Sequence, residues 1–209
     1  MFVESITAIN RNKRRVCLSQ AADPAFSSFP LRNADILAFS LREGGEVSPE
    51  IWEEICLTLR KDCLSKSADL LKSQDYTVAR LKKKLREASF PAPVIDEAVA
   101  EMEEAGYLDD RRYAESFLRA HMGDRSFLKL RQDLKDRGVS GAVIEEAFAG
   151  AEDEGILSNQ EEEQIRKILS KKGFDKETAD WEEKQKMMAA LYRRGFSSET
   201  IRRVLGETE

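Results

Sequence analysis

The sequence has few of the residues from which metal sites and disulfide frameworks are built. Among 209 residues it has three cysteines and one histidine, His121. Cys17, Cys56 and Cys63 are too far apart for a C-x-x-C pair, and no cluster has the spacing of metal ligands. We therefore expect no bound metal or other cofactor, and a chain that carries reduced thiols in the cytoplasm.

Long apolar runs are also missing. No segment approaches the roughly 20 apolar residues of a membrane span. The N-terminal segment MFVESITAINRNKRRV lacks the apolar run and the cleavage site of a secretion signal. Glycine (11) and proline (5) are scarce, while 35% of the residues are charged. This composition indicates a soluble, mainly helical protein without a membrane partner.

Motifs of catalysis are missing as well. The sequence has no phosphate-binding glycine loop, no H-E-x-x-H and no G-x-S-x-G, and no cysteine shares a motif with His121. Asp109 and Asp110 could act as an acid/base pair, but helix N-capping accounts for them more simply. We expect no catalytic residues and no enzyme.

The charges that are present are unevenly distributed. The net charge of −5 argues against a polycation that coats any nucleic acid. Basic residues cluster at RNKRR (11–15), RLKKKLR (80–86) and 192–205, and acidic residues at 95–104 and 161–163. We therefore expect a surface striped with both signs.

Residues 1–63 differ from the rest of the chain. ESITAIN, RRVCLSQ and FSSFPLR are short runs of β-forming residues, and they indicate a small β-containing module. Helices are expected to follow. Ser48 can cap a helix that has Pro49 at its first position.

From residue 64 the chain repeats itself. LKKKLREASFPAPVIDEAV (81–99), LRQDLKDRGVSGAVIEEAF (130–148) and MMAALYRRGFSSETIRRVL (187–205) align without a gap. Their apolar positions coincide, as follows: Leu81, Leu130 and Met187; Leu85, Leu134 and Leu191; Phe90, Val139 and Phe196; Ile95, Ile144 and Ile201; Val99, Phe148 and Leu205. Spacings of four on each side of a break predict two helices and a turn.

The break has the chemistry of a helix end. Gly138 and Gly195 can adopt the left-handed conformation, Ser140 and Ser197 can cap the next helix, and in the first copy Pro91 and Pro93 interrupt the helix. A preceding helix completes each unit. It is carried by SADLLK (67–72) in the first copy and by residues 111–122 in the second, and Thr77 and Ser126 are expected N-caps of the second helix.

The segments GYLDD (106–110) and GILSN (155–159) mark the joints between units. Gly106 and Gly155 end one unit, Leu108 and Leu157 anchor the turn, and Asp109 and Ser158 can cap the next helix. The expected organisation is an N-terminal β-containing extension (1–63) and three-helix repeats at 64–108, 109–157 and 158–209.

The third repeat has eight extra residues between its joint and its helix pair, so its first helix or connector is expected to be about two turns longer. We expect neighbouring repeats to stack into an elongated, curved and mainly α-helical body.

Basic residues are the candidate binding residues. Surface solvation explains any single one of them, but their recurrence in stacked repeats could align them along an anionic partner. The candidates are Lys82, Lys83, Arg86, Arg111, Arg112, Arg119, Arg125, Lys129, Arg131, Lys135, Arg193 and Arg194. Tyr76, Tyr107 and Tyr113 could stack on bases, although we expect Tyr107 to be buried in a joint.

These residues resemble the RecX family of bacterial regulators of the RecA recombinase. The resemblance is carried by GYLDDRRYAESFLRAH followed by LRQDLKDRGVSGAVIEEAF, with the flanking helix pairs in the expected order. Residues 1–60 resemble the N-terminal extension of longer members. Asp133 stands where the family commonly has Glu.

The resemblance implies a non-enzymatic monomer that lies in the helical groove of the RecA filament on single-stranded DNA. There it would inhibit recombinase, ATPase and co-protease activities, or promote shortening of the filament, in recombination, repair and the SOS response. The basic residues would contact phosphates or carboxylates.

Two other classes stay open. A stand-alone helical DNA-binding regulator would use one helix-turn-helix pair for sequence readout, but here no single pair stands out. A structural repeat scaffold would bind another protein without salt-sensitive binding to DNA.

Overall fold

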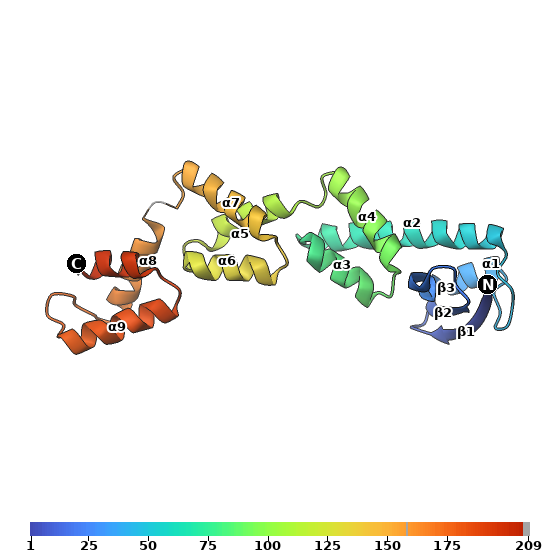
Figure 1. The fold of residues 1–209 in the computed structure, drawn as a ribbon, viewed down its shortest axis with the longest axis horizontal. Coiled ribbons are helices and arrows are strands. Elements are labelled where there is room, and N and C mark those ends of the chain that lie inside the picture. The colour runs from blue at the N-terminus through green and yellow to red at the C-terminus, as the bar shows by residue number, and fades with distance from the viewer. Residues whose placement is uncertain (158, 207–209) are drawn as a thin grey trace. The chain divides into compact units, whose positions relative to one another are not determined.

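The computed structural model describes residues 1–157 and 159–206 and divides the chain into two compact units, Met1–Asp109 and Asp110–Glu209 (Figure 1). Within the described residues the structure is mainly helical, with one small sheet near the N-terminus. None of the helices in this part of the chain is long and apolar enough to cross a membrane.

Unit 1 begins with a three-stranded antiparallel sheet. Strands β1 (Phe2–Ala8), β2 (Lys13–Ser19) and β3 (Ser28–Arg32) lie in the order β1-β2-β3, and a short 3-10 helix (Pro24–Phe26) precedes β3. Val16 pairs with Phe29, and both side chains are fully buried. The alternation of buried and exposed residues places one face of β2 in the core. The predicted β-containing module is therefore confirmed.

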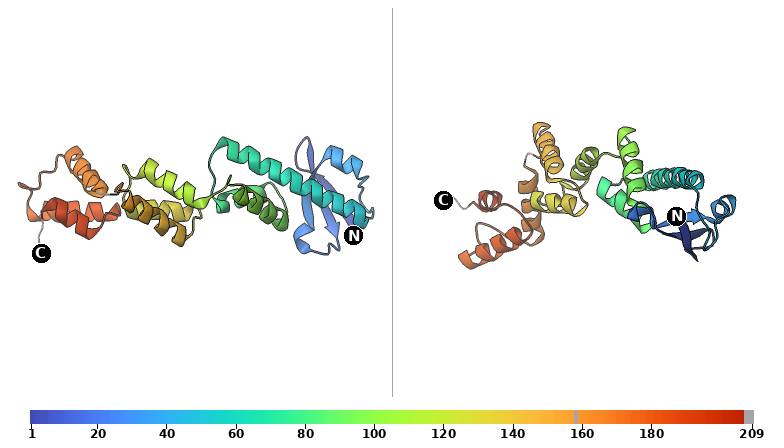
Figure 2. Two further views of the ribbon diagram at one scale, coloured as in Figure 1. Left: turned by 90° about the horizontal axis from the view of Figure 1, so that it is seen from above. Right: turned by 45° about the vertical axis from the view of Figure 1, so that its right-hand side comes forward.

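Helix α1 (Asn33–Ala38) follows the sheet directly, and α2 (Pro49–Ser73) is the longest helix of unit 1. The predicted cap is confirmed, because the Ser48 hydroxyl accepts the N–H of Ile51 at 3.4 Å and Pro49 is the first helical residue. The boundary expected between residues 63 and 64 lies inside α2. The N-terminal half of this helix lies beside the sheet and its C-terminal half beside the next two helices (Figure 2).

Helices α3 (Val78–Glu87) and α4 (Ala92–Glu104) complete repeat 1, with the end of α2 as its first helix. A single apolar core joins these helices to the sheet. It contains Val16 and Phe29 from the strands, Leu59 from α2 and Leu85 from α3. The N-terminal extension and repeat 1 are therefore one packed body.

Unit 2 contains two three-helix repeats. Repeat 2 consists of α5 (Asp110–His121), α6 (Phe127–Asp136) and α7 (Gly141–Asp153), and repeat 3 of α8 (Gln160–Lys171), α9 (Trp181–Arg193) and α10 (Ser198–Leu205). Each repeat has its own apolar core, one around Leu134 and one around Leu191. Unit 2 is thus built differently from unit 1, which has a single core.

The alignment of the three repeats is confirmed by burial. Leu85, Leu134 and Leu191 are fully buried, and nearly all the other matched apolar positions are buried. Met187 is partly buried against the core of repeat 3. The spacing of four residues therefore identified the inner faces of the helices correctly.

The turns within the repeats have the predicted chemistry. Gly138 and Gly195 have φ angles of +84° and +87°, and the hydroxyls of Ser140 and Ser197 accept backbone N–H groups of α7 and α10. In the first copy Ser89 takes the left-handed conformation (φ +67°), and α4 begins directly after Pro91. The expected caps Thr77 and Ser126 are also confirmed.

The glycines and leucines of the joints lie as expected, whereas Tyr107 does not. Gly106 and Gly155 have positive φ, Leu108 is buried, and Leu157 packs against the core of repeat 2. Tyr107 is 68% exposed, so its predicted burial is wrong. The side chain of Leu108 takes the buried place instead. Asp109 directly precedes α5, whereas Ser158, the other expected cap, lies outside the described residues.

The extra residues of repeat 3 do not lengthen its first helix. Helices α5 and α8 each have 12 residues. The connector 172–180 is longer than the equivalent connector 122–126, and α9 has 13 residues whereas α6 has 10. Asp180 caps α9 in a capping box with Glu183, which explains why α9 begins earlier than the repeat pattern indicates.

Candidate interaction surface

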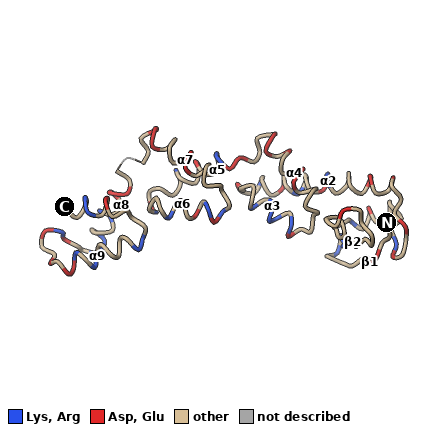
Figure 3. Tube along the Cα trace, viewed as in Figure 1, with Lys and Arg blue, Asp and Glu red and all other residues tan. Residues whose placement is uncertain are grey.

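Charge is divided between the helices of repeats 1 and 2. In α3 and α6 basic residues outnumber acidic ones, whereas α4 and α7 carry acidic residues and no lysine or arginine (Figure 3). Lys82 on α3 pairs with Asp96 on α4 at 2.7 Å, and Arg131 on α6 pairs with Glu145 on α7 at 2.9 Å. These two pairs occupy equivalent repeat positions. Each pair therefore links the two helices of its repeat.

These two ion pairs each engage one of the candidate binding residues, Lys82 and Arg131. The Arg131 guanidinium also lies 3.8 Å from the ring centre of Phe148, a cation–π contact within the repeat. Arg131 lowers the pKa of Glu145 by hydrogen bonding. Lys82 and Arg131 are thus engaged within their own repeats. At the equivalent positions, repeat 3 has Met188 and Arg202 instead.

A second group of candidates surrounds Asp133. Arg125 and Lys129 approach its carboxylate to 2.6 and 2.9 Å. Burial alone would raise the pKa of Asp133, but the two cations hold it below its ordinary value. Arg125 and Lys129 therefore help to fix the N-terminal turn of α6.

Sequence reasoning missed the partners of this group. Arg137 donates to the Asp133 carbonyl at 2.9 Å, and its guanidinium lies 4.5 Å from the ring centre of Phe117. Arg125 lies 5.7 Å from the same ring, and Tyr113 stacks on it. The signal was the spacing of four between Tyr113, Phe117 and His121, which places all three on one face of α5. Tyr113 is thus occupied by packing, and Tyr76 is buried.

The remaining candidates on α5 are paired in part. Arg111 forms an ion pair with Glu115 at 3.1 Å, and Arg119 pairs with Glu154 of α7 at 3.2 Å. Arg112 is exposed at the start of α5. Surface pairs of this kind contribute little to stability, typically about 0–1 kcal/mol.

Five candidates are exposed and form no ion pair with another residue of the described ranges. They are Lys83, Arg86, Lys135, Arg193 and Arg194. Lys83 and Arg86 lie on α3 of unit 1, and Lys135 lies on α6. Arg193 and Arg194 end α9. These side chains are the most available cations among the predicted site residues.

The structure brings three of the candidates in unit 2 together. The Ser126 hydroxyl caps α6 and also donates to the Arg194 carbonyl at 2.8 Å, so the start of α6 meets the end of α9. Lys129 lies in that first turn of α6, and Arg193 and Arg194 lie at the end of α9. We call this region the Ser126 junction surface. It consists of Leu128, Lys129, Tyr192, Arg193 and Arg194.

Two exposed apolar side chains belong to this surface. Leu128 is 63% exposed and Tyr192 65% exposed. Leu128 lies against Gly195, where an added Cβ would be 3.4 Å from the Leu128 Cβ. Exposed apolar groups beside cations are typical of surfaces that bind a partner. Sequence reasoning missed this cluster because its halves are about 65 residues apart.

Buried polar groups hold this junction. The Glu161 carboxylate of α8 accepts the N–H of Phe127, the first residue of α6, at 2.7 Å. The Gln164 amide donates to the carbonyls of Met122 and Arg125. Burial raises the pKa of Glu161, although the Phe127 N–H opposes the shift. These bonds join repeats 2 and 3 within unit 2.

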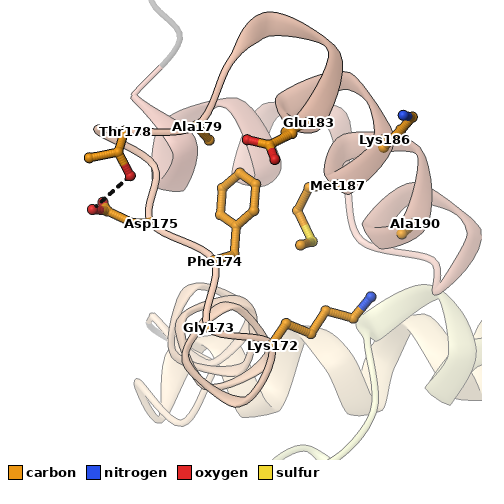
Figure 4. Close-up of a pocket in the computed structure, with 10 residues that line it drawn as sticks. All are labelled: Lys172, Gly173, Phe174, Asp175, Thr178, Ala179, Glu183, Lys186, Met187 and Ala190. Carbon is orange, nitrogen blue, oxygen red and sulfur yellow. Dashed lines mark hydrogen bonds between the residues drawn. The ribbon is translucent and has the colours of Figure 1, made fainter.

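The longer connector of repeat 3 forms a pocket of about 620 Å³ against α9. Phe174 and Met187 face each other across it (Figure 4). Its carboxylates have structural roles, because Asp175 accepts the N–H of Glu177 and the Thr178 hydroxyl, and Glu183 belongs to the α9 capping box.

The described residues also include no group of His, Cys, Asp and Glu that could hold a metal ion. Burial raises the pKa of the Cys63 thiol to about 12, so this side chain packs as an apolar residue. The described residues that could bind another molecule are therefore the exposed apolar and basic side chains of the Ser126 junction surface and the other exposed cations.

Comparison with known proteins gives the family. Models of the second and third three-helix domains of RecX match residues 109–147 and 160–205. The regulatory protein RecX of Trichlorobacter lovleyi is 33% identical over 147 residues, which cover 68% of this chain and 93% of that protein. The chain belongs to the RecX family.

Other RecX proteins agree with this assignment. The regulatory protein RecX of Pseudomonas fluorescens is 32% identical over 66% of this chain and 85% of that protein. A crystal structure of regulatory protein RecX covers 99% of both chains with a TM-score of 0.63 and 20% identity. RecX from Lactobacillus salivarius covers 72% of this chain with a TM-score of 0.62 and 18% identity. These two structures share the fold.

Proposed function

We propose that this protein is a non-enzymatic cytoplasmic regulator of the RecA recombinase. It binds the RecA filament on single-stranded DNA, in the helical groove, and inhibits strand exchange, ATP hydrolysis and co-protease activity. The observation that carries the proposal is membership of the RecX family, through both matched three-helix domains and a 33% identical regulatory protein.

Features of unit 2 support this proposal. The Ser126 junction surface combines exposed apolar side chains with Arg193 and Arg194, which form no ion pair with a residue of the described ranges. The third cation, Lys129, forms an ion pair with Asp133, which partly neutralises its charge. Such a surface suits a partner that offers both apolar groups and anions, as a protein filament on DNA does.

The test follows ATP hydrolysis by a preformed RecA filament on single-stranded DNA, with this protein added well below one copy per RecA protomer. We expect inhibition by the native protein. The variant Arg193→Glu with Arg194→Glu should inhibit at least several-fold less, because it reverses two cations of the junction surface.

A matched control is Lys167→Glu with Lys171→Glu, which changes the net charge equally on exposed positions of α8. This control should inhibit as the native protein does. If neither ATP hydrolysis nor filament length changes with the folded native protein and its own host's RecA, the proposal fails. A DNA-binding regulator independent of RecA would then be the better hypothesis.

A further inference from the structure

The connection between β1 and β2 is an ordered turn that carries arginines. Asn10 Oδ1 accepts the N–H groups of Asn12 and Lys13, each at 2.9 Å, and the Lys13 carbonyl accepts the N–H groups of Ile9 and Asn10. Four hydrogen bonds therefore fix the tip of the hairpin. Arg11 lies within this tip, so binding through it requires little further ordering of the backbone.

The arginines of this hairpin have neutral partners. Arg14 Nε donates to Asn33 Oδ1 at 3.2 Å, and Arg15 Nη2 donates to Ser89 Oγ at 3.0 Å. Arg11, Arg14 and Arg15 are exposed, and no carboxylate of the described residues forms an ion pair with them. Residues 9–15 include no acidic residue. Their positive charge is therefore uncompensated, unlike that of Lys13, which pairs with Asp62.

The hairpin lies against the end of the basic helix α3. Arg15 reaches Ser89 in the turn after α3, and Lys13 lies 5.8 Å from the ring centre of Phe90 in the same turn. The Ser89 N–H donates to the Arg86 carbonyl at 2.8 Å, so Arg86 belongs to the turn that Arg15 contacts. The positive charge of Arg15 also interacts favourably with the C-terminal, negative end of the α3 dipole. Its contact therefore links the hairpin to this turn, and the side chains of Arg11, Arg14 and Arg86 are all exposed.

We propose that Arg11, Arg14 and Arg86 form a binding surface for the phosphodiester backbone of single-stranded DNA. A guanidinium with unused donors binds a phosphate through two parallel hydrogen bonds, and a fixed turn holds it in place for this contact. The surface deepens the proposed function, because it assigns a DNA contact to unit 1. It rests on the geometry of unit 1 alone and is tested on DNA without RecA.

The experiment measures binding of the full-length protein to fluorescently labelled oligothymidine by anisotropy over a range of salt concentrations. The test variant is Arg11→Glu with Arg14→Glu. We expect its dissociation constant to rise about tenfold. The slope of log K against log salt should become shallower by about 1.4, from roughly 0.7 for each lost phosphate contact on a single strand.

Matched variants separate phosphate recognition from net charge. Lys66→Glu with Lys72→Glu makes the same change of charge on exposed positions of α2 and should leave binding within about twofold. Arg11→Lys with Arg14→Lys should keep most of the salt slope and lose part of the affinity. Far-ultraviolet circular dichroism verifies that each variant is folded. A labelled duplex of equal length tests whether binding favours the single strand.

The inference is overturned if the folded glutamate variant binds oligothymidine as the native protein does, or if the α2 control loses as much affinity. Binding of the duplex with equal affinity would overturn the choice of single-stranded DNA. Failure of the proposed function looks different. The native protein would then leave RecA activity unchanged, while the hairpin variant still lost affinity for DNA.

Discussion

Units 1 and 2 contain the same three-helix repeat but stabilise it in different ways. In unit 1 the repeat shares one apolar core with the sheet, and the long helix α2 belongs to both. In unit 2 each repeat has its own core. The two repeats are joined by hydrogen bonds that the Glu161 carboxylate accepts and that Gln164 and Ser126 donate. A repeat that is too small to stand alone can therefore be completed by an apolar neighbour or by a polar junction.

Cations of repeat 2 and of the β1–β2 hairpin have partners of different kinds. In unit 2 the candidates Arg125, Lys129 and Arg131 bind carboxylates of their own repeat. In unit 1 the arginines of the hairpin bind neutral groups. Neutralised arginines act mainly in packing, whereas uncompensated ones attract an external anion. The number of arginines in a region is therefore a poor guide to its binding capacity.

The largest predicted effect is the loss of stability when a core leucine is truncated in each unit. Leu85→Ala in unit 1 and Leu191→Ala in repeat 3 remove equivalent, fully buried side chains, and each should cost about 2–5 kcal/mol. In unit 1 the loss should spread to the sheet, because Leu85 and the strands share one core. Hydrogen exchange measured by mass spectrometry should therefore show faster exchange in Lys13–Ser19 as well as in α3.

Leu191→Ala serves as the counterpart. It should speed exchange in α8, α9 and α10 and leave the apolar core of repeat 2 largely protected, since the two cores are separate. Unchanged exchange in the sheet of Leu85→Ala would show that the sheet and repeat 1 unfold independently. The shared core would then not be a cooperative one.

Much of this arrangement could be predicted from the sequence, because it depends on local spacing. The matched apolar residues, the serine caps within the repeats and the turn glycines Gly138 and Gly195 are signals within a few residues of each other. The serines and glycines were confirmed, as were all the matched apolar positions except Met187, which is partly buried. The continuity of α2 through residue 63 was missed, because the boundary was placed at the change in composition alone.

The candidate surface was less predictable. Sequence spacing identified exposed cations but not their partners, since Arg119 meets Glu154 and Ser126 meets Arg194 across the tertiary structure. Tyr107 shows the same limit on a smaller scale. Either Tyr107 or Leu108 could have filled the joint by its apolar character, and the direction of the chain after Gly106 decided between them.

A smaller loss of stability is expected when a glycine at the junction of unit 2 is replaced. Gly195→Ala and Gly106→Ala both place a side chain at positive φ, which costs roughly 1–2 kcal/mol. At Gly195 the new Cβ would also lie 2.8 Å from Ser126 Oγ, whereas at Gly106 it would meet nothing within 4 Å. Thermal unfolding should therefore show a larger loss of stability for Gly195→Ala.

The pair of variants isolates the junction from backbone strain, which both share. Gly195→Ala should also weaken RecA inhibition under the proposed function, because it separates Arg194 from the start of α6. Equal losses of stability for the two variants would contradict a tight contact between Ser126 and the end of α9.

The smallest effect concerns Glu161, the buried carboxylate of the same junction. Its folded pKa is raised above the ordinary value, so protonation favours the folded state. The stability that it contributes is fully present below the pKa of about 4.5 of the unfolded chain. This contribution is lost as the pH rises through the folded pKa. Glu161→Gln keeps an oxygen that can accept the Phe127 N–H and removes the charge.

We therefore expect Glu161→Gln to match the native protein in stability near pH 4 and to equal or slightly exceed it at pH 7. Chemical denaturation at the two pH values measures this difference, with Glu163→Gln, an exposed position on the same helix, as the control. A marked loss of stability at pH 7 would mean that the ionised carboxylate itself holds the junction. Repeats 2 and 3 would then be joined by charge, and the contrast with the apolar core of unit 1 would be sharper still.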